Sequence, residues 1–125
     1  MRQETASPQE LRQAVLAYYD ALDRDDVEAV LGCFAGDVLY RRPGYPTMAG
    51  IDQLRAYYET DRKLAAGRHM VRDVLVEDFQ AAAQGMYEGQ LRDGDRMTMG
   101  FGAFFDFDGA ARICEHTTYF FTPSV

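Results

Sequence analysis

The 125-residue chain has the length of a single domain, and 47% hydrophobic with 26% charged residues is the composition of a protein with a packed core. Its formal net charge of −7 at pH 7 argues against nucleic acid or an anionic membrane surface as a partner. No apolar run is long enough to span a bilayer, and residues 1–7 lack an apolar signal segment. We therefore expect one cytoplasmic domain over residues 1–125, with its core at about 8–122.

Three helices are predicted in the first half of the chain. Ser7-Pro8-Gln9-Glu10 is a capping box with proline at the first helical position, and the spacing of the apolar residues after it defines one helix face: Leu11, Val15, Tyr18 and Leu22. A second helix is predicted over 27–34, with Asp25 as its cap, and a short strand over 38–42. A third helix is predicted over 51–66, with Gly67 as its C-cap.

The second half reads as strands at 68–78, 82–92, 96–107 and 112–122. Asp93-Gly94-Asp95 and Asp108-Gly109 mark tight turns between them. The last three strands are long, and long strands joined by tight turns must curl to bury one face. We therefore predict an α+β cone, in which three N-terminal helices pack on a strongly curved, mostly antiparallel sheet around an internal pocket.

Strict alternation along these strands predicts which side chains face the pocket. In 96–107 the inner row is wholly apolar: Met97, Met99, Phe101, Ala103 and Phe105. In 112–122 it contains His116, Thr118 and Phe120, and in 82–92 it contains Met86, Glu88 and Gln90. The apolar row predicts a largely hydrophobic ligand.

The element order and the segment 22–38, LDRDDVEAVLGCFAGDV, resemble the nuclear transport factor two-like superfamily over residues 11–121. This superfamily includes ketosteroid isomerases, SnoaL-like polyketide cyclases, scytalone dehydratase and limonene epoxide hydrolase. The resemblance is specific for the fold and weak for the function, because many chemistries share the fold. It also implies a homodimer, for which the outer row of the sheet, with Thr98, Gly100, Gly102 and Tyr119, would supply a flat surface.

Compared with ketosteroid isomerases, the resemblance places Tyr18 at the oxyanion-hole tyrosine and Tyr58 at a supporting tyrosine. The general-base aspartate is replaced by Arg42 before Pro43, and the second oxyanion acid by Ala103. The resemblance therefore argues against a steroid-isomerase mechanism of that kind.

Other branches of the superfamily match at different positions. The catalytic aspartate of the SnoaL-like cyclases and of limonene epoxide hydrolase falls at Thr118. Scytalone dehydratase has an acid–base histidine at His69 and an aspartate near Asp23, whereas its second histidine has no match. Asp23 is either a solvated helix-end charge or the partner of His69.

Two histidines and one carboxylate are the candidates for proton transfer. His69 or His116 could act as general base, or could be hydrogen-bonded within the sheet. A buried Glu88 would need a partner, for which Arg42 is the candidate, whereas a register shifted by one residue would expose it. Tyr18 and Tyr58 could donate hydrogen bonds to a ligand oxygen, or could simply pack.

The sequence indicates neither a metal site nor a cofactor. His69, His116 and Glu88 come from three separate elements and lack local ligand spacing. Cys33 and Cys114 lie inside apolar patterns, which is typical of reduced, buried thiols, with a disulfide as the alternative.

Three functions are consistent with these residues. The first is a cofactor-independent isomerase, cyclase or dehydratase that acts on a small, hydrophobic, oxygenated, polyketide-like molecule. Its catalytic candidates are His69, His116 and Tyr18, and its ligand-contacting candidates are Tyr58, Arg42, Glu88, Thr118, Met97, Met99, Phe101 and Phe120. The second is a non-catalytic protein that binds a ligand in the same pocket, and the third is an accessory protein whose pocket is vestigial.

Overall fold

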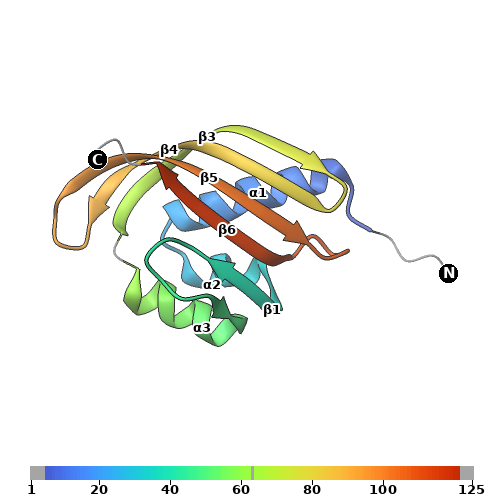
Figure 1. Ribbon diagram of the computed structural model, residues 1–125, viewed down its shortest axis with the longest axis horizontal. Coiled ribbons are helices and arrows are strands. Elements are labelled where there is room, and N and C mark those ends of the chain that lie inside the picture. The colour runs from blue at the N-terminus through green and yellow to red at the C-terminus, as the bar shows by residue number, and fades with distance from the viewer. Residues whose placement is uncertain (1–4, 63, 122–125) are drawn as a thin grey trace.

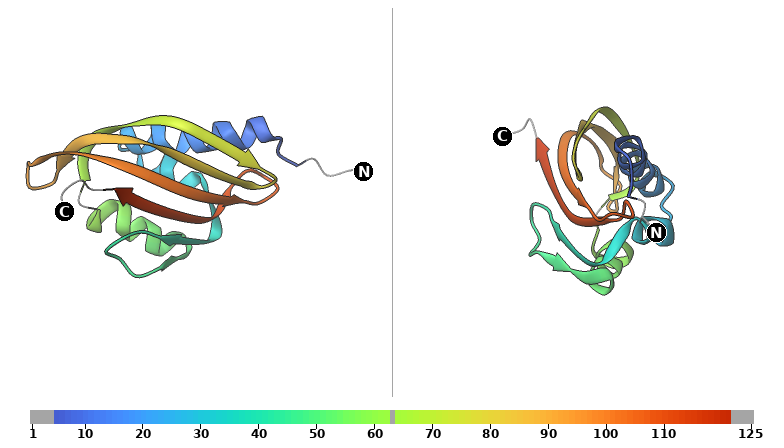
Figure 2. Two further views of the ribbon diagram at one scale, coloured as in Figure 1. Left: turned by 45° about the horizontal axis from the view of Figure 1, so that its top comes forward. Right: turned by 90° about the vertical axis from the view of Figure 1, so that its right-hand side faces the viewer.

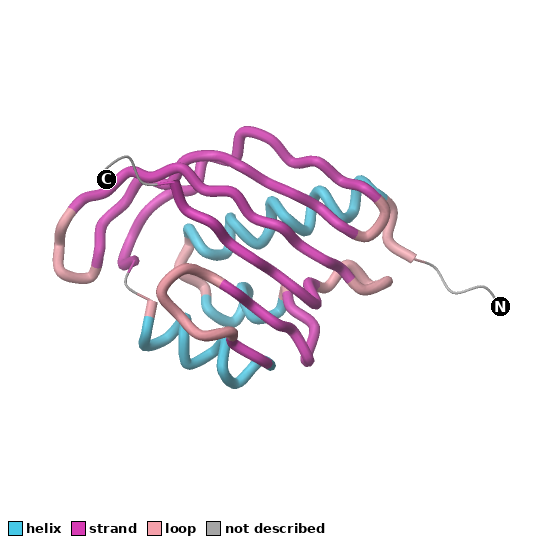
Figure 3. Tube along the Cα trace, viewed as in Figure 1, coloured by secondary structure: helices cyan, strands magenta, loops and turns pink. Residues whose placement is uncertain are grey.

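The computed structural model describes residues 5–62 and 64–121, with helices first and long strands after (Figures 1 and 3). The helices are α1 (Pro8–Asp23), α2 (Val27–Gly32) and α3 (Gly50–Ala56), and α3 continues as one π-helical turn, η1 (Tyr57–Asp61). The strands are β1 (Phe34–Arg41), β2 (Met48–Ala49), β3 (Leu64–Glu77), β4 (Gln80–Leu91), β5 (Arg96–Phe107) and β6 (Ile113–Phe121).

These strands form one mixed sheet in the order β2-β1-β6-β5-β4-β3. Strands β3 to β6 are an antiparallel meander, and β1 runs parallel to β6. The sheet is strongly curved, with α1 against its concave side and α3 beside β1 (Figure 2). The predicted α+β class, with helices on a curved and mostly antiparallel sheet, is confirmed. The convex side is called the outer face below.

Helix α1 begins as predicted. The Glu10 N–H donates to Ser7 Oγ (3.2 Å) and the Ser7 N–H donates to Glu10 Oε1 (3.0 Å), which closes the capping box. The predicted face is buried, together with Tyr19 and Ala21, and packs on β3 and β4. This packing holds the tyrosines of α1 over the concave side of the sheet. No helix in the described ranges is long and apolar enough to cross a membrane.

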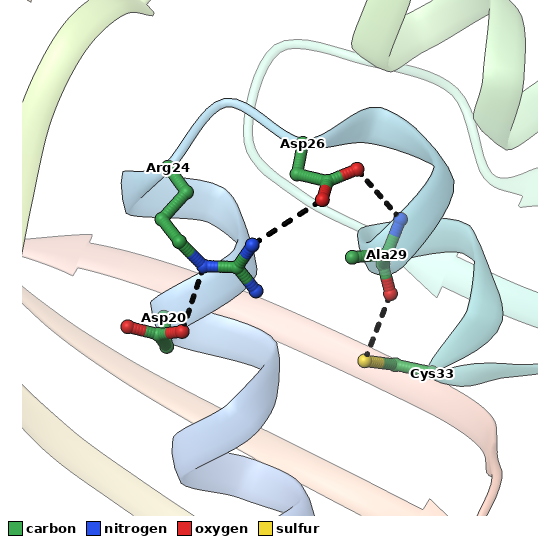
Figure 4. A network of polar contacts seen from close by, with 5 residues as sticks. All are labelled: Asp20, Arg24, Asp26, Ala29 and Cys33. Carbon is green, nitrogen blue, oxygen red and sulfur yellow. Dashed lines mark hydrogen bonds and ion pairs between the residues drawn. The ribbon is translucent and has the colours of Figure 1, made fainter.

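The turn between α1 and α2 is held by charged side chains (Figure 4). Arg24 donates from Nε to Asp20 (2.9 Å) and from Nη1 to Asp26 (3.2 Å). Asp26, not the predicted Asp25, caps α2 by accepting from the Ala29 N–H (3.1 Å), because Asp25 takes a left-handed turn conformation with φ 55°. Helix α2 ends at Gly32, earlier than predicted, since residues from Phe34 onward pair with β6.

The third helix is shorter than predicted. It loses α-helical geometry after Ala56 and ends at Asp61, and Gly67 lies inside β3 rather than at a C-cap. Pairing of the segment from Leu64 with β4 outweighs its helix propensity. A Cβ at Gly67 would lie 2.1 Å from Tyr87 Oη and 2.8 Å from the Glu88 carbonyl oxygen, so the close approach of β4 requires glycine there.

The predicted inner faces are correct for two strands and wrong for a third. In β5 the residues Met99, Phe101, Ala103, Phe105 and Phe107 are buried, and in β6 His116 and Thr118 are buried. In β4 the inward residues are Ala81, Ala83 and Tyr87, whereas Met86 and Glu88 are exposed. The inner face of β4 lies under α1 and carries Tyr87 besides two alanines, so the apolar character of Met86 did not indicate an inward side chain.

We expect Gly85→Ala to destabilise the fold strongly. An added Cβ would lie 2.0 Å from the Met70 carbonyl oxygen and 3.0 Å from Val71 Cα, next to the register shift between Val71 and Asp73. Backbone atoms cannot move aside as a flexible side chain would, so the free energy of unfolding should fall by about 2–3 kcal/mol. Urea unfolding measures it. Gly102→Ala is the control, since its nearest neighbour would be 3.9 Å away, and an equal loss in both variants would contradict the prediction.

Candidate functional site

An internal cavity lies between α1, η1 and the concave side of the sheet, where the pocket was expected. The space in which a water-sized sphere can be centred measures about 20 Å³, which is room for about one water molecule. Its walls carry most of the predicted polar candidates, and the lining residues are Tyr18, Tyr19, Leu22, Tyr40, Arg42, Tyr58, Arg62, His69, Phe101, Thr118 and Phe120. A larger hollow of about 760 Å³ lies on the outer face, away from these groups.

Asp23 and His69 form a hydrogen-bonded pair at the cavity. The Asp23 carboxylate accepts from the backbone N–H of His69 (2.9 and 3.1 Å to its two oxygens) and lies 2.6 Å from Nδ1. Asp23 is the last residue of α1 and His69 lies on β3, so helix packing on the sheet creates the pair. An Nδ1–H that donates to a carboxylate leaves Nε2 as the ring nitrogen able to accept a proton.

Burial keeps His69 neutral. Its side chain is 9% exposed, and the rings of Tyr19, Tyr87 and Phe101 surround it at 4.9, 4.7 and 5.3 Å between centroids. Burial lowers the pKa of His69, and the Asp23 carboxylate offsets only part of the shift. At neutral pH the ring therefore has a free lone pair, as a general base requires.

Tyr18 and Tyr58 meet in the cavity wall. Their hydroxyl oxygens are 2.8 Å apart and both side chains are buried. Burial raises the pKa of both phenols well above the usual value, so both stay protonated. One hydroxyl donates to the other, which leaves one proton available to a ligand oxygen.

A directed chain of hydrogen bonds crosses the wall from Arg42 to His116. Arg42 Nη1 donates to Tyr40 Oη (3.2 Å), Tyr40 contacts Thr118 Oγ1 (3.4 Å), and Thr118 contacts His116 Nε2 (3.3 Å). His116 Nδ1 lies 3.1 Å from the Phe104 carbonyl oxygen. A guanidinium only donates and a carbonyl only accepts, so every bond in the chain points the same way and His116 carries its proton on Nδ1.

His116 therefore lies behind the cavity wall and does not line it. It stacks between Tyr40 and Phe105, with centroids at 4.7 and 4.3 Å, and both ring nitrogens have partners. Burial lowers its pKa to about 3. This environment is that of a neutral structural histidine, so the two predicted histidines have different surroundings.

The predicted Arg42–Glu88 pair is wrong. Glu88 is exposed on the outer face of β4 opposite Arg68, because β4 presents its odd-numbered residues inward. Arg42 instead faces the rings of Tyr45, Tyr57 and Phe120, with its guanidinium carbon 5.7, 5.2 and 4.9 Å from their centroids.

A second hollow adjoins the cavity. It measures about 310 Å³, opens to solvent, and is lined on one side by Leu91, Met97 and Met99. Arg42 and Phe120 line both spaces and so form the partition between them. The predicted apolar row is therefore divided between two spaces. Met97 and Met99 line the 310 Å³ hollow, and Phe101 lines the cavity.

Four lining residues were not among the predicted site residues, and one of them, Leu22, lies on the predicted face of α1. Tyr19 lies four residues after the buried Val15, and this spacing could have identified it. Tyr40 alternates with Val38 on β1, which also indicates an inward side chain. Arg62 follows η1, and the end of that turn could not be placed from local sequence.

The cysteines and metal-ligating residues give no further site. Cys33 and Cys114 are free, half-buried thiols, whose Sγ atoms donate to the carbonyl oxygens of Ala29 and Asp106. In residues 5–62 and 64–121 no group of three or more His, Cys, Asp or Glu side chains could hold a metal ion.

Solved structures share this architecture. A nuclear transport factor two-like protein of unknown function from Burkholderia pseudomallei superposes with a TM-score of 0.80 at 21% identity, over 89% of this chain and 90% of that one. A protein from Xanthomonas campestris, provisionally assigned as a polyketide cyclase, gives 0.74 at 25%, over 91% and 92%. TerC, co-crystallised with polyporic acid, gives 0.76 at 21%, over 92% of both chains.

Sequence comparison identifies the family. A search of curated proteins found no match. The profile of the SnoaL-like domain matches residues 15–116, which is most of the chain. The predicted resemblance to the nuclear transport factor two-like superfamily is therefore confirmed, and the chain belongs to the SnoaL-like domain family.

Proposed function

We propose that the chain is a cofactor-independent enzyme that moves a proton on a small, hydrophobic, oxygenated molecule, in an isomerase, cyclase or dehydratase reaction. The observation that carries the proposal is the Asp23–His69 pair, held at 2.6 Å against an internal cavity. A carboxylate that orients a neutral imidazole is the usual arrangement of a general base.

Each wall residue has a role in such a reaction. His69 Nε2 takes a proton from a carbon next to a carbonyl group, and Asp23 stabilises the imidazolium that forms. The negative charge that develops on the carbonyl oxygen is stabilised by the free proton of the Tyr18–Tyr58 pair. The imidazolium then returns the proton to another atom of the substrate, so no electrons are lost or gained.

The comparisons support small-molecule chemistry of this type. The Xanthomonas relative is provisionally assigned as a polyketide cyclase, and TerC was crystallised with an organic ligand. The superposition with each of them covers more than nine-tenths of this chain.

A non-catalytic binding protein is the second candidate. Two family positions for a catalytic aspartate hold Arg42 and Thr118. The cavity also has room for about one water molecule until the Arg42–Phe120 partition moves. A binding protein would use the same cavity and the same tyrosines without transferring a proton.

Native mass spectrometry of the purified protein, searching for a co-purified small molecule, supplies the ligand. Incubating that molecule with the protein in D2O then separates the two candidates. An enzyme that removes a proton from carbon should introduce deuterium into the ligand, observed by NMR. A ligand that binds tightly and gains no deuterium and no new product would support the binding protein instead.

We also propose that the outer face joins two copies of the chain. Phe104, Tyr119 and Phe121 are 58%, 57% and 74% exposed there, beside the hollow that contains Gly100 and Gly102. Light scattering should show a dimer, and Phe104→Ser with Tyr119→Ser should give a monomer. Leu16→Ser, on α1 away from this face, is the control. A wild-type monomer at micromolar concentration would contradict this assembly.

A further inference from the structure

We propose that the ligand of the cavity carries a carboxylate group, which Arg42 and Arg62 hold. The inference rests on the proposed function only in taking the cavity as the binding site. It adds the chemical class of the ligand and two residues that select it.

Arg62 places one positive charge at the cavity. The residue is 8% exposed and lines the cavity, and none of the described carboxylates lies within 4.0 Å of its guanidinium nitrogens. Its backbone is fixed, since its N–H donates to the Tyr57 carbonyl (2.8 Å) and its own carbonyl accepts from Arg92. The side chain is therefore a positive charge placed at the cavity by a well-anchored turn.

Arg42 places a second positive charge at the cavity. One of its nitrogens, Nη1, donates to Tyr40 Oη, and its Nε is buried with no partner among the described residues. The three rings around it offer cation–π contact but no negative charge. Its counter-ion is not Glu88, which lies on the outer face of the sheet.

The charges at the cavity do not balance. Arg42 and Arg62 line the cavity and no described carboxylate does, while both oxygens of Asp23, the partner of His69, are occupied by that histidine. After burial, the largest cause, both guanidinium groups lower the pKa of His69, as positive charges close to one ring would. A buried charge without a partner destabilises a protein, whereas a bound anion would offset that cost.

The geometry of the donors favours a carboxylate. A guanidinium presents parallel N–H groups that match the two oxygens of a carboxylate, and such charge-assisted bonds are strong. The arginines would hold the carboxylate while His69 faces the reacting carbon. The apolar remainder of the ligand would extend past Phe120 toward Met97 and Met99 in the open hollow.

Matched pairs of unreactive probes test the inference: acetate and acetamide, benzoate and benzamide, 2-naphthoate and 2-naphthamide. Each pair differs in charge and hardly in shape. Ligand-observed NMR titration at pH 7 should show that at least one carboxylate binds tenfold or more tightly than its amide. Arg62→Met should remove that preference by weakening the carboxylate at least tenfold and leaving the amide within about twofold. Arg42→Met should act in the same direction.

The control variant is Arg112→Gln, which removes one positive charge from an exposed ion pair with Asp108 and should leave both affinities unchanged. A second measurement needs no ligand. Without probe, Arg62→Met should melt a few degrees above wild type, because it removes a buried charge that lacks a partner. Benzoate should raise the melting temperature of wild type and not that of Arg62→Met.

Three results would overturn the inference. These are carboxylates that bind no better than their amides, a preference that survives in Arg62→Met, and a lower melting temperature of Arg62→Met without probe. None depends on turnover, so loss of the carboxylate preference with proton exchange retained would refute this inference alone. Arginine-dependent binding without any exchange would refute the enzyme and leave the inference standing.

Discussion

His69→Gln should lower the turnover of the identified ligand by about a hundredfold to ten-thousandfold, the usual contribution of general acid–base catalysis. A glutamine amide can still donate to Asp23, as Nδ1 does at 2.6 Å, but it cannot take a proton at neutral pH. Affinity should change little, because the cavity wall keeps its shape and its hydrogen bond. Turnover and ligand affinity are measured separately on the same preparation.

Two further variants make this result specific. Asp23→Asn should lose part of the rate, since an amide orients the imidazole without stabilising its charged form. His116→Asn should change the melting temperature rather than the rate, because that ring lies behind the wall with both nitrogens bonded. Full turnover in His69→Gln would remove this histidine from the mechanism.

The rate should also depend on pH in a defined direction. Burial lowers the pKa of His69, so the ring is the neutral base across neutral pH. The value of kcat/KM should therefore be constant above the usual histidine range and fall only in more acidic solution. In Asp23→Asn the decline should begin at lower pH, because the carboxylate that raises the pKa has gone. A decline at higher pH in that variant would contradict the pairing.

Local patterns predicted the elements that follow one simple period. The capping box at Ser7 and the helical spacing that includes Tyr18 located α1, and alternation located the inner faces of β5 and β6. These features depend on neighbouring residues in the chain. The buried stripe of α1 is wider than the predicted face because Tyr19 also packs against rings of β3 and β5.

Predictions failed where a distant strand determines the structure. The segment from Leu64 pairs with β4, so the third helix stops early and Gly67 serves close strand approach instead of a helix cap. The inner face of β4 was reversed, because an apolar Met86 and a charged Glu88 on one face do not reveal which side α1 covers. Because the inward face of β4 was assigned wrongly, Glu88 was expected to pair with Arg42, whereas it lies on the outer face of the sheet.

At the site, too, local features could be predicted, whereas contacts between distant elements could not. The resemblance placed Tyr18, Tyr58, Arg42 and His69 at the pocket, and all four line the cavity. The pairing of Asp23 with His69 was one of two alternatives, since it depends on where the end of α1 meets β3. The charge excess at the cavity could not be predicted, because it follows from the exposure of Glu88 and the burial of Arg62 together.

The free energy of unfolding should fall as the solution is acidified below about pH 6.5, mainly because of His116. Burial lowers its pKa to about 3 in the folded chain, whereas an unfolded histidine titrates near 6.5. Between these values the unfolded state binds a proton that the folded state does not, so stability is complete above about 6.5 and is lost as the pH falls. His69, whose pKa is also lowered, acts in the same direction.

The expected slope is about 1.4 kcal/mol per pH unit for His116 alone, or about 2 kcal/mol between pH 6.5 and 5. Below that window, protonation of ion-paired carboxylates such as Glu28, whose pKa Arg55 lowers, adds to the loss. Burial raises the pKa of Tyr18, whose ring contacts His116, and Arg42 stays charged, so neither changes charge between pH 5 and 7. The slope in this window therefore reports histidine.

Urea unfolding at pH 7, 6, 5.5 and 5 measures this slope, with tyrosine fluorescence as the signal, since the chain has eight tyrosines and no tryptophan. His116→Asn keeps a donor for the Phe104 carbonyl and cannot titrate, so its slope should be shallower by about 1.4 kcal/mol per pH unit. His69→Gln is the matched control and should keep the His116 part of the slope. If His116→Asn does not fold, NMR of the wild-type ring gives the same answer, because a neutral Nδ1–H imidazole at pH 5 requires the lowered pKa. A ring that titrates near 6.5 in the folded protein would contradict the prediction and with it the directed chain from Arg42.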